Sequence, residues 1–306
     1  MKVILIHNPD AGDGAHPSGD QVLRLIREAG YSVDYQSSKE KNWHGVLREP
    51  SDVVAVAGGD GAVGKVARRL VGSGTPIAIL PMGTANNVAS TLGLTERTLK
   101  NLILGWETAR RVKFDIGVAE GPWGSERFIE GFGVGLFAET MSRIQDEGLE
   151  EFPRSENPEE RMISVLNMLK QHLQSYPSRD LTVRLDGQDM SGEYVLLEAM
   201  NIRYIGPNLD LVPGANTGDG LLDIVYLSRG EEAKLSRYLS DCIERKGSPA
   251  NLTVRRCRHV HMKWEGFPVH IDDEAWPERN DSTSPVGTNI IDVKVEPGAL
   301  EFLTPG

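Results

Sequence analysis

Three apolar runs, separated by segments with helical spacing, place the strongest limit on the fold of this chain. The runs KVILI, DVVAVA and PIAIL are short and continuous, as in strands buried on both faces of a sheet. Residues 21–29 and 63–71 place apolar side chains on one helical face, YSVDYQ is a further strand candidate, and another helix is expected over about residues 85–92. Strands and helices that alternate in this order predict a parallel α/β sheet.

Three loops rich in glycine and small polar residues follow the predicted strands. They are NPDAGDG (residues 8–14), GGDGAVG (58–64) and PMGTANN (81–87). Right-handed crossovers bring the strand-to-helix loops of a parallel sheet out at the same edge. Backbone N–H groups of such loops can approach an anion closely, and helix N-termini can face it. The sequence therefore predicts a phosphate-binding edge.

The second loop fits two phosphate-binding patterns in part. Gly59, Gly61 and Gly64 copy the dinucleotide fingerprint, which also needs an acidic residue about 20 positions further on. That region reads AILPMGT and has no acid. Gly59, Gly64 and Lys65 copy a P-loop, which needs Ser or Thr after the lysine, whereas this chain has Val66. Neither pattern is complete.

The second part of the sequence has a different character. Strand candidates follow one another, several with period-two alternation, and helices are few. We predict an α/β domain over residues 1–112, to which residues 297–306 could return, and a β-rich, β-sandwich-like domain over residues 113–296. The charged stretch from Asp146 to Arg161 is expected to be a solvated loop leading into an amphipathic helix over residues 162–173.

Composition narrows the functional class. The net charge of −11 and the pI near 5.2 argue against nucleic-acid binding, because nucleic-acid-binding proteins carry basic surfaces. Cys242 and Cys257 lack a C-x-x-C spacing and are expected to be reduced thiols. The N-terminal apolar run is too short for a signal peptide, and no run approaches the roughly 18 apolar residues of a membrane span. We expect a cytoplasmic protein with at most peripheral membrane contact; the sequence is also compatible with a homodimer.

Several motifs occur together in a recognisable order. GGDG is followed one β-α-β unit later by P-x-G-T-x-N and preceded by N-P-x-x-G-x-G, a combination that resembles the diacylglycerol kinase catalytic domain family. Bacterial lipid kinases, sphingosine kinases and, more distantly, NAD kinases share this fold. The later segments FIEGFGVGLFAET, TGDGLLDIVYL and VHIDDEAW are similar to further family motifs. The resemblance implies a lipid kinase that transfers the γ-phosphoryl of ATP to the hydroxyl of diacylglycerol or a related lipid with Mg²⁺.

The resemblance also implies roles for individual residues. On the nucleotide side, the residues that match family motifs are Asn8, Gly58, Gly59, Asp60, Gly61, Gly83, Thr84 and Asn86. On the lipid side, Asp272 and Glu274 match a D-G-E stretch whose Asp is implied to activate the lipid hydroxyl. Asp219 matches an Asp that holds Mg²⁺ in relatives. Phosphoryl transfer does need anion donors, a cation and a carboxylate that orients the attacking hydroxyl.

The sequence departs from the family near these motifs. Ala62, Gly64 and Lys65 stand where the family usually shows Thr and Asn-Glu. Asn87 replaces an Asp, and Asp273 replaces the Gly of D-G-E. These departures leave open a catalytically weakened relative that binds nucleotide or lipid. An NAD kinase-like enzyme is another alternative, although the N-E and G-S-T-A-Y motifs of those enzymes are not found. Lys65 could supply charge to a phosphate or be a solvated helix residue.

Overall fold

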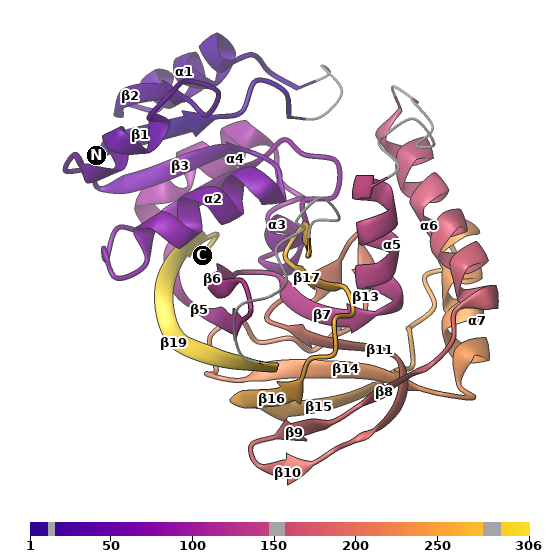
Figure 1. The fold of residues 1–306 in the computed structure, drawn as a ribbon. Coiled ribbons are helices and arrows are strands. Elements are labelled where there is room, and N and C mark those ends of the chain that lie inside the picture. The colour runs from indigo at the N-terminus through magenta and orange to yellow at the C-terminus, as the bar shows by residue number, and fades with distance from the viewer. Residues whose placement is uncertain (12–15, 147–156, 278–288) are drawn as a thin grey trace. The chain divides into compact units, whose positions relative to one another are not determined.

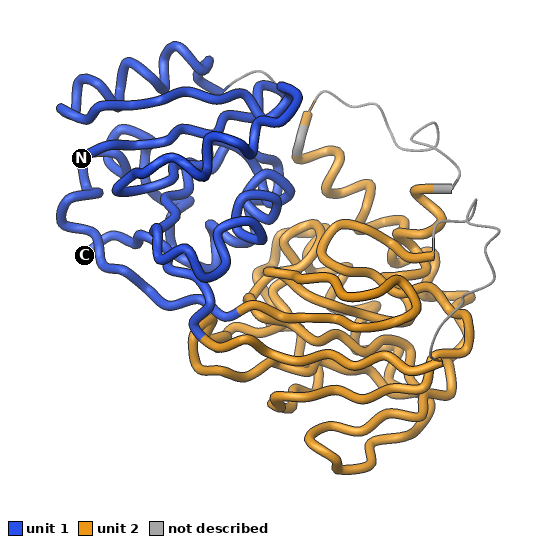
Figure 2. The backbone as a smooth tube through the Cα atoms, turned by 60° about the vertical axis from the view of Figure 1, so that its left-hand side comes forward, with its two compact units in different colours: residues 1–115, 298–306 blue, residues 116–297 orange. Residues whose placement is uncertain are grey.

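The chain folds into two compact units. The computed structural model describes residues 1–11, 16–146, 157–277 and 289–306. Unit 1 comprises Met1–Asp115 and Gly298–Gly306, and unit 2 comprises Ile116–Pro297 (Figure 2). The chain passes between the units twice, within strands β5 (Arg110–Gly121) and β19 (Ile290–Thr304).

Unit 1 is built on a parallel sheet with helices between its strands (Figure 1). Besides the ends of β5 and β19, its elements are β1 (Lys2–His7), α1 (Gly19–Glu28), β2 (Ser32–Ser37), the 3₁₀ helix η1 (Trp43–Arg48), β3 (Val53–Gly58), α2 (Asp60–Leu70), β4 (Ile77–Pro81), α3 (Asn87–Thr91), α4 (Leu99–Leu104) and the 3₁₀ helix η2 (Trp106–Thr108). The strand order is β2-β1-β3-β4-β19, and every neighbouring pair is parallel. The predicted parallel α/β sheet is confirmed.

Local chemistry sets where the helices of unit 1 begin. The Ser18 side chain accepts the backbone N–H of Gln21, whose own side chain accepts the N–H of Ser18, and this capping box fixes the start of α1. Helix α2 begins at Asp60, directly after the buried strand β3 and earlier than predicted. Gly61 and Gly64 therefore lie inside the helix, and the chain forms neither a P-loop nor a dinucleotide-binding loop here.

Unit 2 contains two packed sheets. Its strands, in addition to parts of β5 and β19, are β6 (Gly124–Phe128), β7 (Gly131–Gly135), β8 (Arg179–Leu181), β9 (Val183–Leu185), β10 (Gln188–Asp189), β11 (Gly192–Met200), β12 (Tyr204–Ile205), β13 (Leu209–Asp210), β14 (Leu222–Ser228), β15 (Thr253–Cys257), β16 (His259–Lys263), β17 (Val269–Ile271) and β18 (Glu274–Trp276). One sheet has the order β15-β14-β11-β7-β17-β18, and β8 pairs with β11. The opposing layer contains β10, β9, β16, β19, β5 and β6. Phe128, Phe132, Val260 and Ile291 belong to the buried core of this sandwich.

Three helices cover the outer face of the β11 sheet: α5 (Leu136–Asp146), α6 (Pro158–Ser175) and α7 (Glu232–Ile243). Leu136, Leu166 and Leu235 of these helices share a buried cluster with Leu196 of β11. The predicted β-rich domain with few helices is confirmed, although α5 and α7 were not predicted. Helix α5 continues the apolar run of β7 without a break, which hides its start in the sequence.

The charged stretch before α6 is helical at its end. Asn157 caps the helix by accepting the N–H of Glu159, and Glu159 and Glu160 lie in the first turn, where the helix dipole favours acidic side chains. The predicted loop is therefore wrong over residues 158–161, and residues 147–156 lie outside the described residues. Within the described parts of the chain, no helix is both long enough and apolar enough to cross a membrane.

Candidate functional site

The predicted phosphate loops of unit 1 meet through their glycines. Gly58 and Gly59 join β3 to α2, and Gly83 follows β4. A Cβ atom on Gly83 would lie 2.4 Å from the Cα of Gly59, so there is no room for a side chain. A Cβ atom on Gly58 would lie 3.4 Å from the Cβ of Asn8 and 2.8 Å from the Cβ of Ala62. The loops after β1, β3 and β4 therefore converge at one edge of the sheet.

Asp60 joins two of these loops through its carboxylate. Oδ2 accepts the backbone N–H of Asn87 at 2.9 Å, and Oδ1 accepts that of Val88 at 3.0 Å. Both donors belong to the first turn of α3, where the N-cap residue Asn86 provides no side-chain cap. The helix dipole adds to the attraction for a negative charge at this position. Asp60 thus holds the GGDG turn against the P-x-G-T-x-N loop.

The other polar matches order their own loops. Nδ2 of Asn86 donates to the carbonyl oxygen of Gly83 at 2.7 Å, and its Oδ1 accepts the N–H of Gly83 at 2.9 Å. Oδ1 of Asn8 accepts the backbone N–H two residues further on, at 3.3 Å. Thr84 is exposed, and Gly61 lies in the first turn of α2. The residues predicted for the nucleotide side therefore all lie on or beside the converging loops.

Several departures from the family have local explanations. Gly64 is buried within α2, and Ala62 fills the space beside Gly58. Lys65 is exposed on the same helix, which favours its interpretation as a solvated residue. Asn87 is buried and gives its backbone N–H to Asp60. Ala62, Gly64 and Asn87, but not Lys65, contribute to the packing around the turn.

In unit 2, Asp272 anchors the turn between β17 and β18. Its backbone has a positive φ of 52°. Its carboxylate accepts the N–H groups of Ile129 at 3.1 Å, Glu130 at 2.8 Å and Gly131 at 3.3 Å. Its own N–H donates to the carbonyl oxygen of Gly131 at 2.8 Å. The side chain therefore ties this turn to the segment that enters β7.

The two acidic residues that follow are exposed. Glu274 begins β18, opposite Ile271 of β17, and Asp273 lies between them in the turn. The positive φ falls on Asp272 and not on Asp273. An Asp side chain at position 273, where the family has Gly, therefore meets no backbone strain. Of the two residues that match the family's D-G-E stretch, Asp272 is bound to backbone N–H groups, whereas Glu274 is exposed to solvent.

Asp219, the predicted Mg²⁺ ligand, is bound to an arginine. Its Oδ1 accepts the N–H of Leu221 at 3.1 Å, and its Oδ2 lies 3.2 Å from Nη1 of Arg256. Nε of the same guanidinium donates to Asp223 at 3.1 Å. Burial raises the pKa of Asp223, and Arg256 offsets part of that shift. Since a cation at Asp219 would have to displace this guanidinium, the arrangement does not fit a preformed Mg²⁺ site.

A buried ion pair, which the sequence argument missed, lies beside the Asp272 turn. Oε2 of Glu198 on β11 and Nε2 of His270 on β17 are 2.6 Å apart, and both side chains are fully buried. They meet over Gly133 of β7, which pairs with both strands and where a Cβ atom would lie 1.8 Å from Oε2 of Glu198. Nδ1 of His270 lies 3.1 Å from the carbonyl oxygen of Asp272. A carbonyl only accepts, so this nitrogen carries a proton and donates it.

The pair holds one shared proton between Glu198 and His270. Burial raises the pKa of Glu198, and His270 opposes this in part. For His270, burial lowers the pKa, but Glu198 and Asp272 together outweigh burial and hold the pKa above its usual value. The pKa of each group is raised, and a raised pKa favours retention of the proton. The signal in the sequence was a lone Glu inside the apolar run YVLLEAM.

Unit 1 also contains a pocket of about 330 Å³ away from the predicted loops. It is lined by residues of α4, η2, the end of β19 and the loop before α4, among them Asn101, Trp106, Thr304 and Arg97. No predicted site residue lines this pocket.

Two family models together cover most of the chain. Residues 2–119 match the diacylglycerol kinase catalytic domain, and residues 158–304 match the YegS C-terminal NAD kinase beta sandwich-like domain. Residues 2–119 thus belong to the diacylglycerol kinase catalytic domain family. Membership in this family explains why GGDG and P-x-G-T-x-N occur together, and it supports a lipid kinase-like enzyme.

Some relatives align along nearly the whole chain. A curated diacylglycerol kinase of Mycobacterium tuberculosis is 29% identical over 320 residues, which cover 99% of this chain and 95% of the relative. The crystal structure of a diacylglycerol kinase from Bacillus anthracis str. Sterne has a TM-score of 0.68 at 19% identity and covers 99% of this chain and 96% of its own. Yeast NADH kinase complexed with NADH has a TM-score of 0.50 at 9% identity, with 100% and 84% covered. These two structures show the fold alone.

Proposed function

We propose that this chain is a lipid kinase that transfers the γ-phosphoryl of ATP to the hydroxyl of diacylglycerol or a related lipid, with Mg²⁺. One observation carries the proposal: in a member of the diacylglycerol kinase family, the GGDG and P-x-G-T-x-N turns are joined by Asp60 and by the contact of Gly59 with Gly83. The acceptor is suggested by the name of the Mycobacterium tuberculosis relative, diacylglycerol kinase.

We assign the ATP phosphates to the converging loops of unit 1. Gly58, Gly59 and Gly83 leave the backbone unshielded by side chains, so phosphate oxygens can approach it closely. Helix α2 begins at this edge and contributes the positive end of its dipole. Because the Asp60 carboxylate already accepts two backbone N–H groups, we assign it to holding the loops rather than to contact with ribose or metal.

We assign the general base to Glu274 and a positioning role to Asp272. A carboxylate that accepts three backbone N–H groups, as Asp272 does, has little capacity left to take a proton from a substrate. Glu274 is exposed and two residues away, at the first position of β18. Its carboxylate can accept the proton of the lipid hydroxyl as the oxygen attacks the γ-phosphorus.

Mg²⁺ would neutralise the charge that develops on the transferred phosphoryl group. Asp219 has the weakest support as its ligand, because Arg256 is bound to the same carboxylate. If Asp219 does hold Mg²⁺, Arg256→Ala should increase the Mg²⁺-dependent rise in melting temperature, and Asp219→Asn should remove it. Equal rises in both variants would place the ion elsewhere.

Turnover tests the proposed function directly. The purified protein is given Mg-ATP with labelled γ-phosphate and mixed micelles that carry diacylglycerol, monoacylglycerol or sphingosine, with NAD in a separate reaction. Label in diacylglycerol or a related lipid is expected. Label in NAD alone would favour the NAD kinase-like alternative. Nucleotide binding by calorimetry without any labelled product would favour the catalytically weakened relative.

Three variants of one turn separate its carboxylates. Glu274→Gln should lower kcat by about 10²- to 10⁴-fold. Asp273→Asn changes the exposed neighbour and serves as the matched control, with activity close to wild type. Asp272→Asn keeps one oxygen for the backbone donors and should lose stability and less than about tenfold in kcat per folded molecule. A larger effect at Asp272 than at Glu274 would reverse the two assignments.

A further inference from the structure

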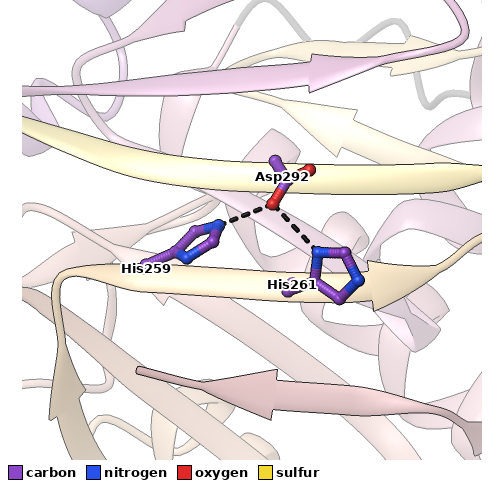
Figure 3. A group of neighbouring side chains, drawn as sticks. All are labelled: His259, His261 and Asp292. Atoms are coloured by element: carbon purple, nitrogen blue, oxygen red, sulfur yellow. Dashed lines mark hydrogen bonds and ion pairs between the residues drawn. The ribbon is translucent and has the colours of Figure 1, made fainter. Parts of the chain in front are cut away.

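A second group of functional side chains lies on the surface of unit 2, apart from the loops and turns discussed above. His259 and His261 are two residues apart on β16, so both point to the same face of the sheet. Asp292 of β19 stands directly opposite His261 in the antiparallel register. The alternate residues, Val260 and Met262, point into the core of the sandwich. The three polar side chains therefore share the partly exposed face, where they are turned toward one another (Figure 3).

The ligand atoms of these side chains converge on one point. Nε2 of His259 lies 2.6 Å from Oδ1 of Asp292, and Nδ1 of His261 lies 3.0 Å from the same oxygen. The three atoms all lie within 4.8 Å of one another. Ligands of a tetrahedral Zn²⁺ with bonds of about 2.0 to 2.1 Å are separated by about 3.3 Å. Small side-chain rotations that open the two hydrogen bonds would therefore admit the ion.

We propose that His259, His261 and Asp292 form a Zn²⁺-binding site. Two imidazole nitrogens and one carboxylate oxygen suit Zn²⁺ and its neighbours, whereas Mg²⁺ prefers oxygen ligands in octahedral geometry. The exposed fractions of the three side chains are 37%, 45% and 27%, which leaves room for water as the fourth ligand. The site is thus separate from the Mg²⁺ of the proposed phosphoryl transfer.

Zn²⁺ at this position would join two strands. The ion would bridge β16 and β19 on the face opposite their core side chains, in addition to the backbone bonds between them. Both histidines and Asp292 belong to unit 2, while β19 continues into unit 1 from Gly298 onward. Bound Zn²⁺ should therefore raise the melting temperature of the protein by mass action.

Two basic residues on the same face should weaken the site. Lys294 stands opposite His259, and Arg184 of β9 stands opposite His261. Nζ of Lys294 lies 3.5 Å from a carboxylate oxygen of Glu120, so part of its charge is balanced. Removal of the charge in Arg184→Ala should tighten Zn²⁺ binding by about two- to sixfold at low salt, because the positive charge on this cross-strand neighbour of His261 repels the ion.

Calorimetric titration of the full chain with ZnCl₂ tests the proposal. We expect one equivalent of Zn²⁺ to bind and the melting temperature to rise. His259→Gln, His261→Gln and Asp292→Asn should each weaken binding by about tenfold or more. His44→Gln, which alters a histidine of η1 in unit 1, and Cys242→Ser, which removes a partly buried thiol, are the matched controls and should bind as wild type.

Two outcomes would overturn the site. One is a wild-type protein that binds no Zn²⁺ saturably; the other is a His259→Gln/His261→Gln variant that binds it as tightly as wild type. If that variant does not fold, Co²⁺ added to the wild-type protein gives a second test. Strong visible absorption of four- or five-coordinate Co²⁺ is expected, and the weak spectrum of octahedral Co²⁺ would refute the proposal. None of these experiments measures lipid phosphorylation. The Zn²⁺ site can therefore be confirmed or refuted even if the protein phosphorylates no lipid.

Discussion

The contact between Gly59 and Gly83 makes Gly83→Ala a sharp test of how the loops of unit 1 are held. The new Cβ would lie 2.4 Å from the Cα of Gly59 and 3.0 Å from Oδ1 of Asn86. Unstrained carbon atoms stay about 3.5 to 4.0 Å apart, so the two backbones would have to separate by more than about 1 Å. Both close atoms at Gly59 belong to the backbone, and no rotamer change can relieve the clash.

The cost of Gly83→Ala follows from two contributions. Overpacking costs about 1 to 3 kcal/mol. Weakening the two hydrogen bonds between Asn86 and Gly83 adds about 1 kcal/mol. We therefore expect the free energy of unfolding to fall by about 2 to 4 kcal/mol, with a loss of ATP affinity.

Urea denaturation followed by circular dichroism measures this loss, and Gly64→Ala is the matched control. A Cβ atom on Gly64 would lie 3.3 Å from Nη1 of Arg68, the mobile end of a long side chain. Gly64 lies inside α2, where Ala is favoured over Gly by about 1 kcal/mol. Gly64→Ala should thus leave stability unchanged or raise it. A Gly83→Ala protein within about 0.5 kcal/mol of wild type would refute the close contact of the two loops.

Further predictions concern the carboxylates. Asp60→Ala removes the acceptor for two N–H groups of α3 and should lower the free energy of unfolding by about 2 to 4 kcal/mol in urea titrations, whereas Asp10→Ala, an exposed control, should not. An equal effect of the two changes would argue against a loop-holding role for Asp60. The raised pKa of His270 stabilises the folded state fully below about pH 6.5, and this stabilisation is lost as the pH rises through the folded-state value. The free energy of unfolding should therefore be lower at pH 8.5 than at pH 6. The difference should be smaller in Glu198→Gln, whose amide can still donate to Nε2 of His270. An unchanged pH dependence in this variant would contradict the shared proton.

Local sequence patterns sufficed to predict the parallel sheet and the converging loops. VVAVA and IAIL are apolar throughout because these residues of β3 and β4 are buried on both faces of the sheet, and this gives a clear pattern in the sequence. The start of α2 at Asp60 was harder to predict, since Gly61 and Gly64 are poor helix formers. Packing against the sheet outweighs that preference.

Long-range bonds could not be predicted from local patterns. Asp272 binds backbone groups of residues 129–131, more than 140 positions earlier in the chain. A short acidic turn looks the same in the sequence whether its first carboxylate meets a substrate or three N–H groups. The ion pair of Asp219 with Arg256 was hidden for the same reason. Motif matching predicted the candidate site residues, and their bonding partners are visible only in the structure.

The meeting of Glu198 and His270 above Gly133 has a consequence for how this protein can change. A methyl group at position 133 would overlap both side chains, since it would lie 1.8 Å from Oε2 of Glu198 and 2.4 Å from Nε2 of His270. Loss of either charged partner alone would leave the other buried without compensation. An apolar replacement is therefore tolerated at Glu198 and His270 only when both change together, and a side chain at position 133 is tolerated only when both have been replaced by smaller residues. A library that randomises position 133 alone should return glycine, whereas one that randomises all three should also return variants with apolar side chains at each.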